Sequence, residues 1–349
     1  MARLRLLEAL IEAEDFEAAI ELRTGDAPAA GIMPDWDRRH VLALQAGGRL
    51  EAALHYATEA LGLVPDNDAL LLMRAELLIR LRRWTDADLA VQQVLERTGL
   101  PLTAAMSGLL AQRRGPDGLL DMLDRQPARF QPGAAGVRRI EALLALGRDA
   151  EALRWMDADA LLWQGALGDF ATAPDFNREL AAEIAEHSQF VADPFEKATR
   201  NGQQANVQLS GTRLVPRLLA AVRGQVEAYA GRLPSACPQF ASLIPARARL
   251  EVWTVRLERG GCQAPHTHAS GWLSGVYYLT GSPGGALEVP LPPEDGRAAP
   301  WPTRKILPEP GRLVLFPSYF RHATIPHDDD APRLSVAFDV VPYTAPASA

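Results

Sequence analysis

Three histidines in the last third of the chain have the residue type and spacing of a metal site. His266 and His268 are separated by one residue and precede a run with the pattern of a strand. In extended backbone, residues two apart project to the same side, so both imidazoles could grip one metal ion. A third ligand must come from elsewhere, and His322 is the candidate because it follows the strand-like run at 313–316. The spacing therefore predicts a metal site with His266, His268 and His322 as ligands.

The segments that must position these histidines have the pattern of β-strands. From residue 247 onward, apolar runs are separated by glycine and proline turns, and we expect strands at 250–257, 273–280, 286–291, 313–316, 322–326 and 334–341. Short strands at this spacing, without a helical period, indicate a sandwich or a barrel. In the last strand Arg333, Ser335 and Ala337 project to one face, so we expect one face to be packed and the other to face a cavity or solvent.

Four segments in this region together resemble bacterial 2-oxoglutarate and Fe(II)-dependent oxygenases built on a double-stranded β-helix. The segments are PHTHASGWLSGVYYL, GGALEVP, PGRLVLFPSYFRHATIP and PRLSVAFD. Their order and spacing are more specific than any one of them alone. The resemblance implies a dioxygenase, acting as a hydroxylase, that uses Fe(II), 2-oxoglutarate as cosubstrate and O2. It implies no catalytic residue beyond the metal centre.

The resemblance also implies which residues bind the cosubstrate. In this superfamily an arginine or lysine shortly beyond the distal histidine binds the far carboxylate of 2-oxoglutarate, and here Arg333 lies 11 residues beyond His322 (333 − 322). A guanidinium stays charged and forms a bidentate pair with a carboxylate. Ser335 shares the strand face of Arg333, and Tyr278 lies on the strand after the histidine pair, so both are candidate hydroxyl donors to the cosubstrate.

The sequence departs from the superfamily at His268, where a carboxylate normally stands. Two coordination schemes stay open: a three-histidine iron site, or a site of His266 and His322 alone with His268 as a donor beside it. An imidazole in place of a carboxylate leaves the site one unit more positive, which should strengthen its hold on an anionic cosubstrate. Glu288 is a candidate replacement carboxylate, but a solvent-facing strand residue is the simpler interpretation. His327 precedes three aspartates, and we expect it in a polar loop near the mouth of the site.

The N-terminal part of the chain has the pattern of helical repeats. Ala19, Ala53 and Ala87 recur at intervals of 34 residues (53 − 19, 87 − 53), which is the period of a tetratricopeptide repeat. Small side chains at such positions let two helices approach closely. A further copy, GRDAEAL, covers 147–153. This part of the chain therefore resembles the tetratricopeptide family, and a generic helical bundle is the alternative.

These patterns predict an α+β chain of two domains. Residues 1–160 are expected to form a tetratricopeptide-like α-helical solenoid, and residues 161–349 an oxygenase domain. Within the second domain we expect a helical connector at 161–232, with its best helices at 175–192 and 212–232. A double-stranded β-helix, or jelly roll, is expected at 247–343.

Stacked helical hairpins present a concave surface that often binds extended peptides or partner proteins. The predicted function is therefore hydroxylation of a peptide or protein that docks on the repeats. One alternative is a cupin-like metal protein that does not use 2-oxoglutarate, and another is a repeat scaffold with an inert barrel. Arg333 discriminates between them, because an oxygenase needs a fixed cation for its cosubstrate and a simple cupin does not.

Composition and charge exclude several other classes of protein. The 349 residues are 48% hydrophobic and 23% charged, as in ordinary globular proteins, and the net charge of −7 argues against binding to nucleic acid. No run approaches the roughly 18 uncharged residues of a membrane span. Cys237 and Cys262 are the two cysteines, so no disulfide framework is expected. The N-terminus lacks the pattern of a signal peptide, and a cytoplasmic location is expected.

Overall fold

The structure is a computed structural model, and it describes residues 2–13, 15–22, 34–97, 102–127, 130–168, 174–194, 197–207, 211–282, 284–293 and 301–343. Contacts divide the chain into two compact units, one that ends at Arg113 and one that runs from Arg114 to Tyr343. The predicted domain boundary at residue 160 falls inside the second unit and stays a prediction.

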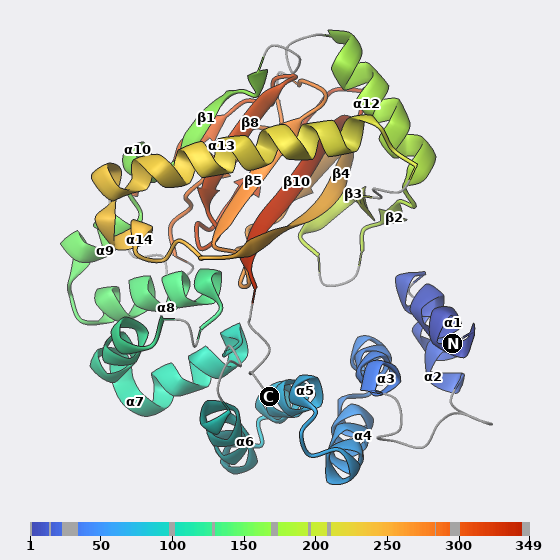
Figure 1. Cartoon of the computed structure of the whole chain (residues 1–349), viewed down its shortest axis with the longest axis vertical. Helices are drawn as coiled ribbons and strands as arrows, with labels where there is room; N and C mark the ends of the chain where they lie inside the picture. The colour runs from blue at the N-terminus through green and yellow to red at the C-terminus, as the bar shows by residue number, and fades with distance from the viewer. Residues whose placement is uncertain are drawn as a thin grey trace. The chain divides into compact units, whose positions relative to one another are not determined.

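The first unit is helical, as predicted. Its helices are α1 (Ala2–Glu12), α2 (Phe16–Glu21), α3 (Pro34–Ala46), α4 (Leu50–Leu63), α5 (Asp68–Arg80) and α6 (Trp84–Glu96), shown in blue to teal in Figure 1. Each helix packs against the next from α1 to α6, and α3 also contacts α1 and α5. Ala19, Ala53 and Ala87 are fully buried, as expected of small residues at helix contacts.

Helix α7 (Ala104–Arg125) is kinked where the two units meet in the sequence. Gly115 has a φ of 70°, which favours glycine, and Pro116 follows it. The second unit continues with α8 (Pro132–Ala145), α9 (Asp149–Trp155), α10 (Ala158–Leu161), α12 (Pro174–His187), α13 (Leu214–Ala236) and α14 (Pro238–Ala241).

Two antiparallel sheets form the rest of the second unit. The larger has seven strands in the order β1-β8-β5-β10-β4-β3-β2. In chain order these are β1 (Trp163–Ala166), β2 (Val191–Ala192), β3 (Thr199–Asn206), β4 (Ala248–Gln263), β5 (Leu273–Tyr278), β8 (Arg312–Pro317) and β10 (Arg333–Pro342). The smaller sheet has the order β7-β6-β9 and consists of β6 (Leu287–Val289), β7 (Arg304–Ile306) and β9 (Ala323–Thr324).

The large sheet has one face against helices and one face toward a cavity. Figure 1 shows α13 lying across this sheet, and the Tyr229 ring of α13 meets the Trp272 ring with centroids 6.3 Å apart. On the same face the Tyr277 hydroxyl of β5 donates to Asn177 Oδ1 of α12 at 2.7 Å. Along β10, Val336, Phe338 and Val340 are buried in the core, while the alternate residues, Arg333, Ser335, Ala337 and Asp339, line the cavity. The predicted alternation of this strand is therefore confirmed.

The stretch predicted as a helical connector contains strands as well as helices. Helices α12 and α13 lie where helices were expected, although α12 ends at His187 rather than at residue 192. Strands β1, β2 and β3 also come from this stretch. The longest of them, β3, has the sequence TRNGQQAN, which lacks the apolar alternation that signals a strand. In the described parts of the chain, no helix combines the length and apolarity needed to cross a bilayer.

Candidate metal centre

The three predicted histidines converge in the cavity of the large sheet. The ligand atoms of His266, His268 and His322 all lie within 4.8 Å of one another. Two backbone hydrogen bonds between His266 and His322, each 3.0 Å long, bring these residues side by side although 56 positions separate them in the sequence (322 − 266). The backbone N–H of His268 donates to the Ser318 carbonyl at 3.0 Å. Backbone hydrogen bonds therefore fix the positions of all three histidines in the cluster.

Each imidazole has one nitrogen committed to a hydrogen bond with the protein. Nδ1–H of His266 donates to the Ala264 carbonyl at 2.7 Å, and Nδ1–H of His322 donates to the Phe320 carbonyl at 2.8 Å. Because a carbonyl only accepts, these bonds place the hydrogen on Nδ1 and leave the Nε2 lone pair free. The third histidine has the same arrangement, since its Nδ1 lies 2.7 Å from Asp339 Oδ2, and its Nε2 is buried without a partner in the described chain.

Burial keeps two of the rings neutral. Desolvation, with repulsion from His268, lowers the pKa of His266 to about 4. Desolvation and the neighbouring imidazoles lower the pKa of His322 well below its usual value. A neutral imidazole is the form that binds a metal. Three converging imidazoles suit Fe, Ni, Cu or Zn, so these residues fit an iron ion.

The carboxylate beside the cluster is Asp339, which the sequence analysis did not single out. It lies on β10, on the cavity face that also carries Arg333 and Ser335. The alternation along the last strand could have indicated it, because residues 333, 335 and 339 project to the same face of that strand. Glu288 is not part of the cluster: it lies on β6 and pairs with Lys305 at 2.9 Å, as the simpler interpretation expected.

The predicted cosubstrate residues line the same cavity as the histidines. Arg333 is 3% exposed, and its Nη1 donates to the Gly285 carbonyl at 2.6 Å. Its guanidinium carbon lies 5.5 Å from the centre of the Tyr278 ring, and Tyr278 is paired with Ser335 across β5 and β10. Arg333 Nε and the Tyr278 hydroxyl are buried without hydrogen-bond partners among the described residues. Buried donors in this state fit an anionic ligand.

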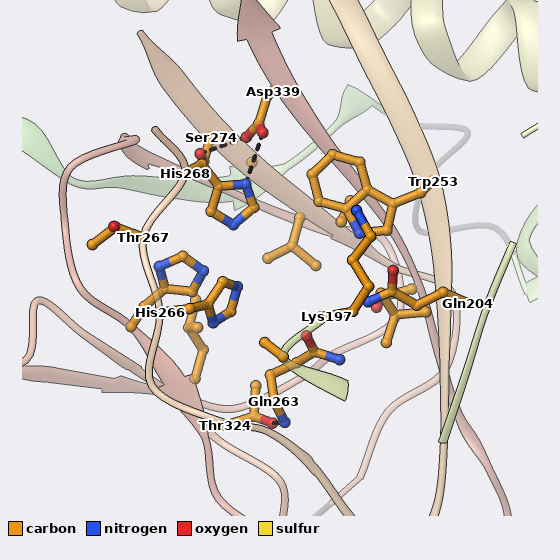
Figure 2. A pocket seen from close by; sticks show the side chains of 18 of the residues that line it. Lys197, Gln204, Trp253, Gln263, His266, Thr267, His268, Ser274, Thr324 and Asp339 are labelled. Carbon is orange, nitrogen blue, oxygen red and sulfur yellow. Dashed lines mark hydrogen bonds and ion pairs between the residues drawn. The ribbon is translucent and has the colours of Figure 1, made fainter. Parts of the chain in front are cut away.

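The opposite wall of the cavity is polar and comes from β3, β4 and the loop before β3. The cavity has a volume of 820 Å³, and Figure 2 shows Lys197 and Gln204 on the side of it away from His266. The Trp253 ring is stacked on the His268 ring, with centroids 5.5 Å apart. Strand β3, which the sequence did not reveal, therefore forms part of the candidate substrate site.

Helix α8 supports the loop that carries His266 and His268. The first-turn N–H of Ala134 donates to the Ala269 carbonyl at 3.0 Å, and Gln131 Nε2 donates to Ser270 Oγ at 3.2 Å. A Cβ atom at Gly133 would lie 1.9 Å from the His268 carbonyl oxygen. The loop and the start of α8 thus approach as closely as glycine allows.

The expectation for His327 was wrong. Its side chain is fully buried, and its Nε2–H donates to the Leu257 carbonyl at 3.1 Å. Its own carbonyl accepts from Gly260 N at 2.7 Å. His327 therefore packs against β4 and does not line the cavity.

Residues 251–339 match a family model described as "Putative 2OG-Fe(II) oxygenase". The C-terminal part of the chain is a 2OG-Fe(II) oxygenase domain. The matched range includes all six predicted site residues and ends on Asp339. The activity of the oxygenase domain therefore requires Fe(II), 2-oxoglutarate and O2, and the histidine cluster could hold the metal.

Several solved structures resemble this chain at low sequence identity. A prolyl-4-hydroxylase from Pseudomonas putida is 19% identical, with 54% of this chain and 96% of that chain covered and a TM-score of 0.40. A prolyl hydroxylase from Trichoplax adhaerens, in complex with a hypoxia inducible factor peptide fragment, is 15% identical, with 56% and 92% covered and a TM-score of 0.38. HygX from Streptomyces hygroscopicus, with nickel and 2-oxoglutarate bound, is 14% identical, with 53% and 84% covered and a TM-score of 0.38. The comparison with curated proteins gave no match.

Proposed function

We propose that the oxygenase domain hydroxylates a peptide or protein, with Fe(II) bound by His266, His268 and His322 and with 2-oxoglutarate bound by Arg333. One observation carries the proposal: the three imidazoles and the buried guanidinium line a single cavity. A cavity of 820 Å³ has room for a cosubstrate and part of a substrate.

The metal and its cosubstrate supply the oxidising chemistry, in which 2-oxoglutarate becomes succinate and CO2 and one oxygen atom of O2 is inserted into a C–H bond. The protein supplies binding, orientation and shielding from water. Three histidine ligands would leave room on the metal for the cosubstrate and O2. Arg333 would pair with the far carboxylate of 2-oxoglutarate, and the Tyr278 and Ser335 hydroxyls would donate to it.

Variants at Arg333 test the role of the cosubstrate. We expect purified protein with Fe(II), O2 and 2-oxoglutarate to form succinate slowly even without substrate, and Arg333→Ala to lose that activity while retaining iron. Arg200→Ala is the matched control, because Arg200 also lines the cavity but is exposed and bonds to backbone carbonyls. Succinate formation by Arg333→Ala at the wild-type rate would contradict the proposal.

For the fold, we propose that the two antiparallel sheets form a double-stranded β-helix and that the N-terminal helices form a tetratricopeptide-like solenoid. The two antiparallel sheets and the buried alanines at 34-residue intervals support these assignments. A cytoplasmic location stays a prediction from the sequence.

The proposal of a peptide substrate rests on the presence of helical repeats and an oxygenase domain in one chain. It is tested by incubating the full chain, Fe(II) and 2-oxoglutarate with a peptide library and measuring masses. We expect a subset of peptides to gain the mass of one oxygen atom, and changes on the surface of the first unit to reduce that gain without reducing succinate formed in the absence of peptide. Oxidation of small molecules alone would contradict this proposal.

A further inference from the structure

We infer that Asp339 is a positioning residue that fixes His268 as the third metal ligand. In this arrangement the carboxylate lies behind an imidazole, whereas the oxygenase superfamily places a carboxylate at the position of His268. This inference rests on the proposed metal site.

The contacts of Asp339 orient it toward His268 from behind. Its Oδ2 lies 2.7 Å from His268 Nδ1, and its Oδ1 accepts from Ser274 Oγ at 2.6 Å. Figure 2 shows both interactions at the edge of the cavity. Ser274 Oγ also lies 2.8 Å from Ser318 Oγ, and the Ser318 carbonyl accepts from the backbone N–H of His268. The hydrogen bond between Ser274 and Ser318 therefore links the residue that holds the carboxylate to the residue that holds the backbone of the histidine.

The surroundings also fix the plane of the His268 ring. Trp253 is stacked on it with 22° between the two planes, and the ring of His322 lies 5.1 Å away with 21° between planes. The ring cannot turn without losing both the Asp339 bond and these contacts. Its Nε2 is thereby held toward the cluster, where it is buried and has no partner in the described part of the chain.

The charge of Asp339 is the second argument. Asp339 is 7% exposed, and in the described chain its carboxylate meets Ser274 and His268 but no arginine or lysine. A buried carboxylate without a cation is costly. A metal ion held by His268 would balance the carboxylate through the ring and would give the buried Nε2 a partner, as in carboxylate–histidine–zinc triads.

The test is Asp339→Asn in the full-length apoprotein, with Co(II) as the probe metal. Asparagine can still accept from His268 Nδ1–H, but it carries no charge. We expect the Kd for Co(II) to rise by about tenfold to a hundredfold, with a change in the ligand-field spectrum of the bound ion. The matched control is Glu251→Gln, because Glu251 lines the same cavity but pairs with Arg249. We expect no measurable change in Kd for the control.

A double-mutant cycle separates a role through His268 from a general effect on charge or folding. If Asp339 acts through this histidine, Asp339→Asn has no further effect on Co(II) affinity once His268→Ala is in place. Equal losses in both backgrounds, or an unchanged Kd in Asp339→Asn, would overturn the inference.

A conservative swap keeps the inference testable if Asp339→Asn folds poorly. His268→Asp alone places two carboxylates together, and we expect weak Co(II) binding. The double variant His268→Asp with Asp339→Asn leaves a single carboxylate, which is at position 268 and can bind the metal directly. We expect Co(II) binding to recover in this variant. If the double variant does not recover Co(II) binding, the role proposed for Asp339 is contradicted. Failure of the wild-type protein to bind Co(II) or Fe(II) would instead overturn the proposed function itself.

Discussion

At the scale of single residues, the site is built from imidazoles that burial keeps neutral. Hydrogen bonds from Nδ1 to backbone carbonyls orient His266 and His322, and desolvation disfavours their protonation. The same features make the apoprotein sensitive to acid, because unfolding exposes these rings to water, where they protonate readily.

We expect the free energy of unfolding of the apoprotein to fall as the pH decreases from about 6.5 to about 4. In this window the unfolded chain binds a proton at His266 and the folded chain does not, so acid favours unfolding. The contribution of His266 reaches about 3 kcal/mol. Urea titrations at several pH values measure it, and His266→Gln should show a shallower dependence on pH. Equal slopes for the variant and the wild type would contradict the assignment.

Most of the residues of the site could be predicted from the sequence, because their spacing follows strand geometry. Because His266 and His268 are two residues apart, their rings were expected on the same side of the backbone. For the same reason Arg333 and Ser335 were expected on the same face of the last strand. Asp339 could have been inferred from that same face, but its partner His268 lies 71 positions away, and no local pattern joins them. The side chain of His327 was misplaced because the aspartates after it suggested an exposed loop.

At the scale of secondary structure, helix α8 and the histidine loop depend on each other. We expect Gly133→Ala to destabilise the protein by about 1–3 kcal/mol and to weaken Co(II) binding, because the added Cβ would collide with the His268 carbonyl oxygen. Thermal unfolding and metal titration measure the two effects. Gly62→Ala in α4 is the control, since no atom lies within 4 Å of its added Cβ. A Gly133→Ala variant with wild-type stability and metal affinity would show that the loop does not depend on α8.

Helix α13, which covers the large sheet, is capped by a residue of α12. Glu183 accepts from the backbone N–H groups of Arg213, Leu214 and Val215, with its shortest contact to each between 2.8 and 2.9 Å. Partial burial raises the pKa of Glu183, but the three donors outweigh it and the pKa is lowered. A lowered pKa means that the carboxylate stabilises the fold above about 4.5 and that this contribution is lost as the pH falls further.

We expect Glu183→Gln to lower the free energy of unfolding at neutral pH by about 1 kcal/mol, as for the loss of a helix cap. The difference from the wild type should shrink at acidic pH, where Glu183 itself becomes protonated. Urea titrations at neutral and acidic pH measure both values. A difference that does not depend on pH would exclude a role for the charge.

The elements that the sequence predicted are those with strong periodicity. Strands β4, β5, β8 and β10 have apolar runs between turns, and the repeated alanines marked the helices of the first unit. Strand β3 escaped prediction because most of its residues are polar. It pairs with β4, and its polar side chains can line the cavity instead of packing in the core. Strands β1 (WQGA) and β7 (RKI) escaped prediction because their sequences lack an apolar run.

At the scale of the whole molecule, the chain joins a unit of helices to a unit that holds an oxygenase domain. The metal cluster, the cosubstrate residues and the cavity all belong to the second unit. The chemistry is therefore expected from the second unit, and recognition of a peptide substrate by the first unit stays a proposal.

The most direct test of the account adds Fe(II) and then 2-oxoglutarate to the full-length apoprotein without oxygen. We predict the weak visible charge-transfer band of an Fe(II)–oxoacid chelate in the wild type and its loss in Arg333→Ala, which should still bind iron. Iron binding without the band in the wild type would contradict the role assigned to 2-oxoglutarate and favour a cupin-like metal protein. Absence of iron binding would contradict the metal site itself.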